Sequence, residues 1–267
     1  MKLLTGLVVL LMAGSAAAHN SCNLDLNGGL RITENAIEFY EDDRSIYKIV
    51  DDKHLEVRGK IQKLTSAQQS LVANYANHIR AAIPEVKGLA LDGIDLAIEG
   101  VVLVFDGLLG EKNKVSAQLT TELTNLKGDI NRHFNSGAAI SFNRKEGDNT
   151  TDLLGKQFET RLERIVETSV QESIGSLMLA VGKEFLSSGG NMDAFERRME
   201  RFGEEMELQM NARAVQMEAR GEKLCNAMVE IDSIEEQLKR SITELESFNV
   251  IKVSEQEMHL AHQVNNH

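Results

Sequence analysis

Hydrophobic residues recur every three or four positions through most of this 267-residue chain, a spacing that places them on one face of an α-helix. Ser66, followed three residues later by Gln69, has the pattern of a capping box at a helix start. Pro84, the only proline, is expected to break or redirect the chain after the first helix. The pattern predicts five helices, over residues 66–83, 86–110, 114–134, 152–187 and 192–247.

Residues 89–110, LALDGIDLAIEGVVLVFDGLLG, are almost entirely apolar except for acids and glycines that each recur every seven residues. Each glycine costs about 1 kcal/mol of helix propensity relative to alanine, so a regular row implies a compensating contact. We expect a helix buried on nearly all sides, whose glycines admit the backbone of a neighbouring helix. The glycines are Gly93, Gly100 and Gly107, and the acids on the opposite face are Glu85, Asp92, Glu99 and Asp106.

The same segment raises the alternative of a membrane element. An acidic residue near the middle of a bilayer costs about 2.5–3.5 kcal/mol on insertion scales, and several acids occur here, so we do not expect insertion. A membrane-associating helix built on residues 86–110 stays open as an alternative, as does an oligomer-forming one.

Residues 23–63 differ from the rest, because short alternating runs separated by turn signals predict four or five β-strands there. A sheet of that size needs a packing partner. Residues 137–143, GAAISFN, predict one further strand that joins it. The expected fold class is therefore mostly α, with long antiparallel or coiled-coil-like helices and a small N-terminal β element.

The long C-terminal helix carries a methionine-rich apolar stripe with steps of three and four residues, as in a coiled coil. Methionine fills gaps between packed helices, but it also suits surfaces that adapt to partners. We take packing as one interpretation and binding of a protein partner as the other. The residues assigned to the partner surface are Met199, Met206, Met210 and Met217.

Residues 1–18 have the features of a secretory signal peptide: one early cation, Lys2, an apolar run, and an Ala-x-Ala cleavage pattern at residues 16–18. The remaining chain divides into a β-rich element at 19–63, a helical part at 64–250 and a polar, histidine-containing tail at 251–267. The formal net charge of the chain is −12. Such an acidic excess without a basic tract excludes nucleic acid as an expected partner.

The order of these features resembles the YggN-like family of periplasmic proteins of unknown function. The resemblance rests on the strand-to-helix run HLEVRGKIQKLTSAQQSLVANYANHIRAAIPEV, the glycine-rich apolar helix, and the late cysteine in EKLCNAM. It covers about residues 22–245 and implies a periplasmic location. An exported chain with two cysteines also favours one disulfide over two free thiols, and the resemblance implies that Cys22 pairs with Cys225.

No motif of an enzyme occurs in the sequence: G-x-S-x-G, H-E-x-x-H, a P-loop and the Rossmann glycine pattern are all absent. We expect neither catalysis nor a cofactor. The tail holds possible metal ligands, and metal binding is a second alternative, although a short terminal tail lacks a fixed frame. The expected function is an envelope interaction or structural protein that binds an unknown protein or itself. The candidate ligands are Met258, His259, His262 and His267, with His19 at the mature N-terminus.

Overall fold

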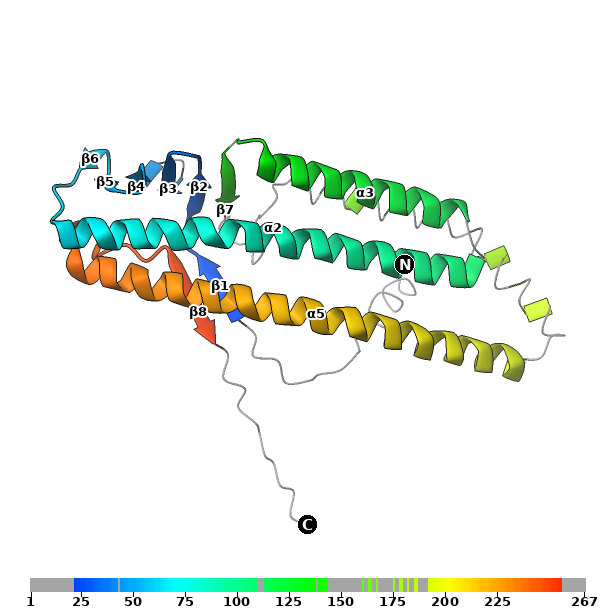
Figure 1. Cartoon of the computed structure of the whole chain (residues 1–267). Coiled ribbons are helices and arrows are strands. Elements are labelled where there is room, and N and C mark those ends of the chain that lie inside the picture. Colours follow the sequence, from blue (N-terminus) through cyan, green and yellow to red (C-terminus); the bar gives the residue numbers. More distant parts are fainter. Residues whose placement is uncertain are drawn as a thin grey trace, which may run out of the picture.

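Three long helices run side by side, and β-strands gather at one end of them (Figure 1). We call this end the body (residues 22–83, 140–143 and 229–255) and the remainder the arm (residues 84–135 and 192–228). The computed structural model describes residues 22–42, 44–109, 113–137, 139–143 and 192–255, together with isolated residues between 160 and 186.

The larger sheet of the body has six antiparallel strands in the order β6-β5-β4-β3-β2-β7. Alternate side chains point into the body, as with Ile37 and Phe39 of β3, which are fully buried. Arg58 and Gly59 both have positive φ angles, which suits a tight hairpin turn between two strands. The strands are β2 (Gly29–Ile32), β3 (Ala36–Glu41), β4 (Arg44–Val50), β5 (His54–Val57), β6 (Lys60–Ile61) and β7 (Ile140–Asn143).

A second, two-stranded sheet joins regions far apart in the sequence. Strand β1 (Cys22–Leu26) pairs antiparallel with β8 (Ile251–Glu255), so that Leu26 lies opposite Ile251 and Leu24 opposite Val253. The short helix η1 (Thr243–Leu245) precedes β8. Part of the range assigned to the polar tail therefore forms a strand.

Helix α2 (Ser66–Leu109) contains 44 residues and is about 66 Å long at 1.5 Å per residue. Its start is capped by Thr65 and Gln68, one residue earlier than expected: the Thr65 N–H donates to Gln68 Oε1 at 2.9 Å, and the Gln68 N–H donates to Thr65 Oγ1 at 3.3 Å. The expected break at Pro84 is wrong, because the helix continues through it. Pro84 is exposed, so water can bind the carbonyl group that loses its helical partner.

Helix α3 (Lys114–Asn135) agrees closely with its predicted range of 114–134, whereas α5 (Met192–Ser241) begins at the predicted residue 192 but ends before the predicted end at 247. Helix α3 is capped by Asn113, whose side chain accepts from the Ser116 N–H at 2.8 Å. Helix α5 ends where Ile242 adopts an extended backbone. The predicted helix over residues 152–187 lies almost wholly outside the described residues.

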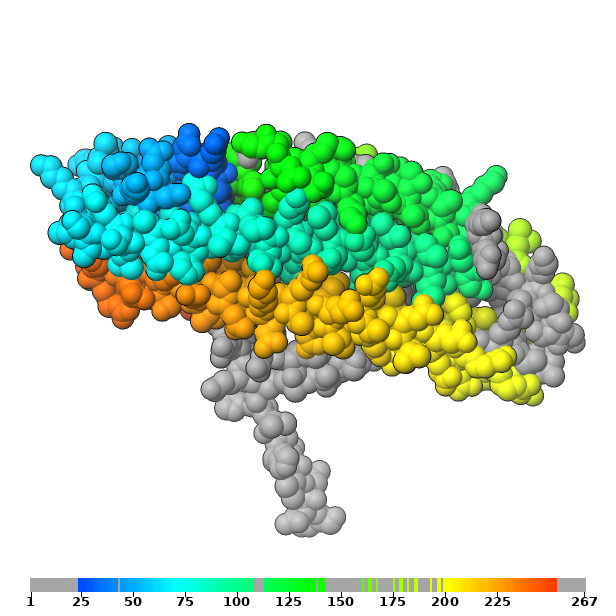
Figure 2. All heavy atoms as spheres, in the orientation of Figure 1, coloured from blue at the N-terminus to red at the C-terminus, as the bar shows by residue number. Residues whose placement is uncertain are grey.

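Helix α2 lies between α3 and α5 in the arm, and between the larger sheet and α5 in the body (Figures 1 and 2). The apolar part of its contact with α3 centres on Ile94, which packs against buried side chains of α3. The α3 residues are Leu123, Leu126 and Ile130.

The main core lies in the body and combines both sheets with α2 and α5. Phe39 and Tyr47 pack ring against ring at a centroid distance of 4.5 Å, beside the buried Tyr75 of α2. Ile231 and Leu238 of α5 reach the same core and are each 1% exposed. The arm has no core of comparable size among the described residues.

The expected fold class is wrong in its β content. The described residues form eight strands, and the six-stranded sheet supplies much of the main core. Strand β7 joins the sheet beside β2 as predicted. Strand β8 was missed because its partner, β1, lies more than 200 residues away in the sequence, and pairing over that distance leaves no local signal.

Candidate functional site

The glycine row of α2 faces α5 and receives large side chains from it. A carbon placed on Gly93 would stand 3.7 Å from the Met217 methyl group, and one on Gly100 would stand 3.5 Å from the Met210 methyl group. At Gly107 such a carbon would collide with the Phe202 ring. A close contact with a neighbouring helix thus compensates for the low helix propensity of the glycines, as expected. The glycines admit side chains of α5, however, and not its backbone.

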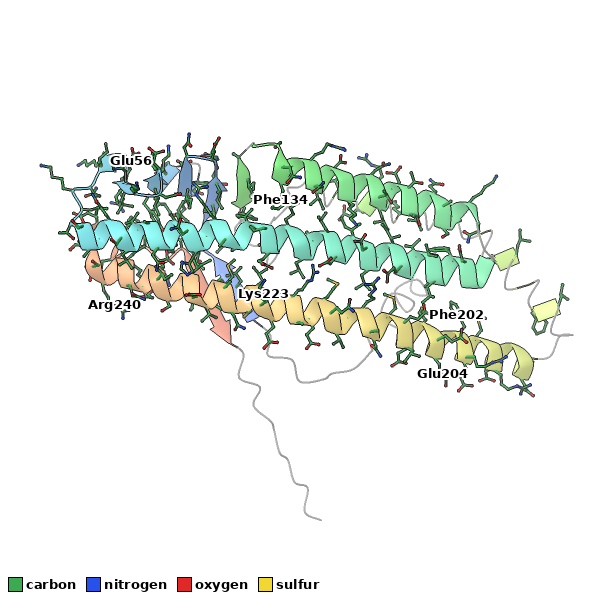
Figure 3. All side chains as sticks on the ribbon, viewed as in Figure 1. Glu56, Phe134, Phe202, Glu204, Lys223 and Arg240 are labelled. Carbon is green, nitrogen blue, oxygen red and sulfur yellow. The ribbon has the colours of Figure 1, made fainter. Side chains whose placement is uncertain are left out.

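Three ion pairs follow this contact along one edge. Lys223 Nζ lies 2.7 Å from Glu85 Oε1, Arg213 donates to Glu99 at 2.5 and 2.9 Å, and Arg220 pairs with Asp92. The partners descend in α5 as they ascend in α2, which defines an antiparallel register. Lys223 and Phe202 both lie along the α5 contact (Figure 3).

The acids of α2 were expected on the face opposite the glycines, but three of them pair with α5, the helix that the glycines also face. Glu85, Asp92 and Glu99 pair with α5 as described. Asp95 accepts from Lys127 of α3 at 2.6 Å, and Asp106 accepts from the Asn113 side chain at 2.8 Å. These contacts tie α2 to both neighbours, and they were missed because the partners lie on other helices.

A groove of about 280 Å³ lies between α2 and α5 at this edge. Its acids and bases already neutralise one another through the ion pairs above. Among the residues that the structure describes, no unpaired nucleophile or base therefore faces the groove, and its chemistry is that of a contact between helices. The lining residues are Asp92, Asp95, Leu96, Ile98, Glu99, Arg213, Gln216, Met217 and Arg220.

The four methionines assigned to a partner surface, Met199, Met206, Met210 and Met217, are all half-buried. Met210 and Met217 pack on glycines of α2, which favours the packing interpretation for these two. That the four methionines together bind a protein partner stays a prediction.

Burial of α2 in the arm is much less complete than expected. Between residues 86 and 107 only Ile94 is buried, although most side chains there are apolar. Val102 is 39% exposed. On α5, Leu208 and Val215 are 75% and 63% exposed and lie seven residues apart on one face. Among the described residues, α3 and α5 cover the helix on two sides, and several apolar side chains of the arm are exposed.

A buried polar cluster lies in the body, where β4, α2 and α5 meet. Glu235 is only 2% exposed. Tyr47 donates a hydrogen bond to Glu235 Oε1 at 3.3 Å, and the hydroxyl groups of Tyr47 and Tyr75 lie 3.2 Å apart. The backbone N–H groups of Val250 and Ile251 donate to the same carboxylate at 3.0 and 2.9 Å. Glu235 therefore ties the segment before β8 to α5.

Burial governs the ionisation of this cluster. Desolvation raises the pKa of Glu235 to about 7, although the backbone N–H groups of Ile251 and Val250, the Tyr47 hydroxyl and the Lys239 charge act in the opposite direction. Burial likewise raises the pKa of Tyr47 and of Tyr75 well above the ordinary value. Inside a body of low polarity the neutral form of each group is favoured.

Glu235 was not among the site residues predicted from the sequence. The spacing of apolar residues in the C-terminal helix did contain a signal that could have identified Glu235. The stripe passes from Ile231 to Leu238 in one step of seven, where its other steps are three or four, and the missing position is filled by Ile234 and Glu235, both buried.

The cysteines are only partly described. Cys225 is a half-buried residue of α5 and is not a free thiol. Cys22 begins β1, but its side chain lies outside the described part of the structure. The candidate metal ligands His19, Met258, His259, His262 and His267 also lie outside it.

Two features of the described residues bear on the metal-binding and membrane alternatives. Across the described ranges, no group of three or more His, Cys, Asp or Glu residues is placed to hold a metal ion. None of the helices in that part of the chain is both long and apolar enough to span a bilayer.

Comparison with protein families gives one match. Residues 22–251 match the model of a family described as a protein of unknown function, DUF2884. Since this range covers most of the chain, the protein belongs to that family. No curated protein and no solved structure matches the chain.

Proposed function

We propose that this member of the DUF2884 family is a YggN-like periplasmic protein that binds other polypeptides along its helical arm. Export is supported by the signal-peptide pattern of residues 1–18. The proposal rests on one observation, the exposed apolar side chains of the arm, which are Val102 of α2 and Leu208 and Val215 of α5. Exposed apolar surface of this kind, where it gathers into a patch, typically marks a site of interaction with protein.

The geometry of the arm supports this role. The glycine contacts and the three ion pairs fix α2 and α5 in register, so the arm presents its apolar side chains from a defined frame. Met199 and Met206, both half-buried, add flexible side chains that adapt to different apolar partners. The partner is another protein or a second copy of the chain.

We further propose that a disulfide between Cys22 and Cys225 ties β1 to α5. Strand β1 contacts α5, and Cys225 is not a free thiol. Because Cys22 begins β1, such a bond would hold the N-terminal strand to the body in an oxidising compartment.

Photo-crosslinking in the intact cell envelope tests the arm. A photoreactive amino acid replaces Val102 or Val215 in the arm, and Ile61 in the body serves as the matched control because it is an apolar residue 72% exposed. We expect the two arm positions to give the same adduct, and Ile61 to give none. An adduct of twice the chain mass would identify a second copy. Equal adducts from all three positions, or none from the arm, would contradict the proposal.

A further inference from the structure

A separate apolar pocket of about 70 Å³ lies in the body, between β1, β7 and the two long helices. Every described side chain that lines it is apolar. Leu24, which is 36% exposed, contributes to its wall, so the pocket borders the protein surface. The lining residues are Leu24, Leu26, Leu30, Ile79, Ala82, Ile83, Val86, Phe142, Met228, Ile231 and Ile251.

In the two-stranded sheet of β1 and β8, which borders this pocket, N–H groups along the outer edge of β8 are bound by carboxylates of α5. The Ile251 N–H donates to Glu235 Oε2 at 2.9 Å, and the Val253 N–H donates to Asp232 Oδ2 at 3.0 Å. Alternate residues of a strand direct their N–H groups to the same edge. Helix α5 therefore satisfies the edge of β8 that faces away from β1, and no further strand can pair there.

The opposite edge of this sheet belongs to β1. The Asn27 N–H donates to the Val250 carbonyl at 2.8 Å. In the register of this pair, the odd-numbered residues of β1 therefore direct their backbone N–H and C=O groups toward β8. Leu24 and Leu26 consequently direct their N–H and C=O groups away from β8. Among the described strands, β8 is the only neighbour of β1, and β7 is likewise an end strand of the larger sheet.

Leu24 and Leu26 belong both to the pocket and to the strand edge that faces away from β8. Their side chains line the pocket, while their backbone groups face the open edge of β1. Phe142, from the end strand β7, lines the same pocket. An open strand edge beside an apolar pocket is the arrangement by which sheets bind extended peptides: main-chain hydrogen bonds supply affinity, and pockets for alternate side chains supply specificity.

We propose that the open edge of β1 binds an extended segment of another polypeptide, which adds to the sheet as a strand and places one aliphatic side chain in the pocket. A hydrocarbon ligand fits less well, because it offers no partner to the N–H and C=O groups of Leu24 and Leu26. The pocket, at about 70 Å³, has less than half the volume of a dry cavity of about 150 Å³ that accommodates benzene, so it takes no more than one small aliphatic side chain. The site is distinct from the arm and does not depend on its function.

The test uses the full mature chain and a short fluorescein-labelled peptide of alternating leucine and threonine, with binding followed by fluorescence anisotropy. A twin peptide with methylated backbone nitrogens cannot donate to a strand edge. We expect the unmodified peptide to bind and the methylated twin to bind at least about tenfold more weakly, a difference of about 1.4 kcal/mol. This comparison needs no variant of the protein.

Two variants locate the site. Leu24→Asp places a charge beside the pocket, and Ile61→Asp makes the same change at an exposed residue of β6 far from it in the sheet order. We expect Leu24→Asp alone to weaken binding, with circular dichroism showing both variants folded. Equal binding of the two peptides, no binding of either, or displacement of the peptide by dodecanoate would overturn the proposal, the last because it would show that hydrocarbon occupies the pocket.

Discussion

The methyl group of Met210 lies 3.5 Å from the point at which a side-chain carbon on Gly100 would stand. That distance is an ordinary van der Waals contact, so α2 has room for a methyl group at this position. The contact between α2 and α5 is therefore close but leaves space at some glycines, so the glycines differ in whether a larger side chain fits in their place.

Gly100→Ala is expected to stabilise the protein, because the new methyl group fits and alanine favours a helix by about 1 kcal/mol over glycine. Gly107→Ala is expected to destabilise it, because the Phe202 ring occupies the space. Gly203→Ala is the control for helix propensity alone, since a side-chain carbon at Gly203 would meet no described atom within 4 Å beyond its own stretch of helix. Urea denaturation measures all three, and a Gly107→Ala variant as stable as Gly100→Ala would contradict this account.

The Arg220–Asp92 ion pair is expected to contribute little to the free energy of unfolding. Its side chains are 57% and 32% exposed, and exposed pairs contribute at most about 1 kcal/mol. A double-mutant cycle with Arg220→Met and Asp92→Asn should give a coupling within that limit, and the coupling should shrink as salt is added. A cycle that combines Arg220→Met with Glu244→Gln, on η1, should show none.

Stability should depend on pH through Glu235. Its pKa is about 7 in the folded protein against 4.5 for the ordinary group, so the folded state holds this proton more tightly than the unfolded state. The contribution is therefore fully present below pH 4.5 and is lost as pH rises to about 7. At 1.36 kcal/mol per pKa unit, the loss is about 3 kcal/mol.

Denaturation of the wild type and of Glu235→Gln across this range measures that contribution. The difference in unfolding free energy between the two should change in favour of the variant as pH rises. Glu236→Gln, at the adjacent residue whose carboxylate is 44% exposed, is the control and should follow the wild type. Parallel curves for wild type and Glu235→Gln would show that Glu235 does not couple to folding.

The two tyrosines of the buried cluster should differ in importance. Tyr47 donates to Glu235 and, by elimination, accepts from Tyr75. Tyr47→Phe therefore leaves the Tyr75 hydroxyl without this acceptor and removes one of the three hydrogen bonds that Glu235 accepts. An unsatisfied buried polar group costs about 1–3 kcal/mol. Tyr75→Phe removes only the end of the chain of hydrogen bonds and should cost less. Equal losses in thermal or urea denaturation would mean that the hydrogen bonds run in another order.

Reduction should destabilise the protein if Cys22 and Cys225 are bonded. A disulfide that closes so long a loop contributes about 2–4 kcal/mol as usually measured. The midpoint of urea denaturation should fall on addition of a thiol reductant for the wild type. For Cys22→Ser it should start low and stay unchanged. A wild type that is insensitive to reductant would refute the bond.

Much of the helical structure follows from the sequence because its signals are local. Helix α3 begins after Asn113 and ends at Asn135, almost as its apolar spacing predicts. Alternation and turn residues also predicted strands before Ser66, although six form there and only four or five were expected. Pro84 misled the prediction, because a single proline on an exposed face interrupts one hydrogen bond without overcoming the packing on the other faces.

Local sequence patterns are enough to predict that the chain forms long amphipathic helices, that the glycine row packs against a close neighbour, and that an N-terminal sheet precedes them, since each depends on residues within a few turns of one another. The three-dimensional fold was needed to show which side chains meet those glycines, that three acids of α2 pair with bases more than 100 residues away, and that Glu235 is buried. It also decided that β8 completes a sheet with β1. These features depend on residues brought together by folding, and no local spacing encodes such contacts.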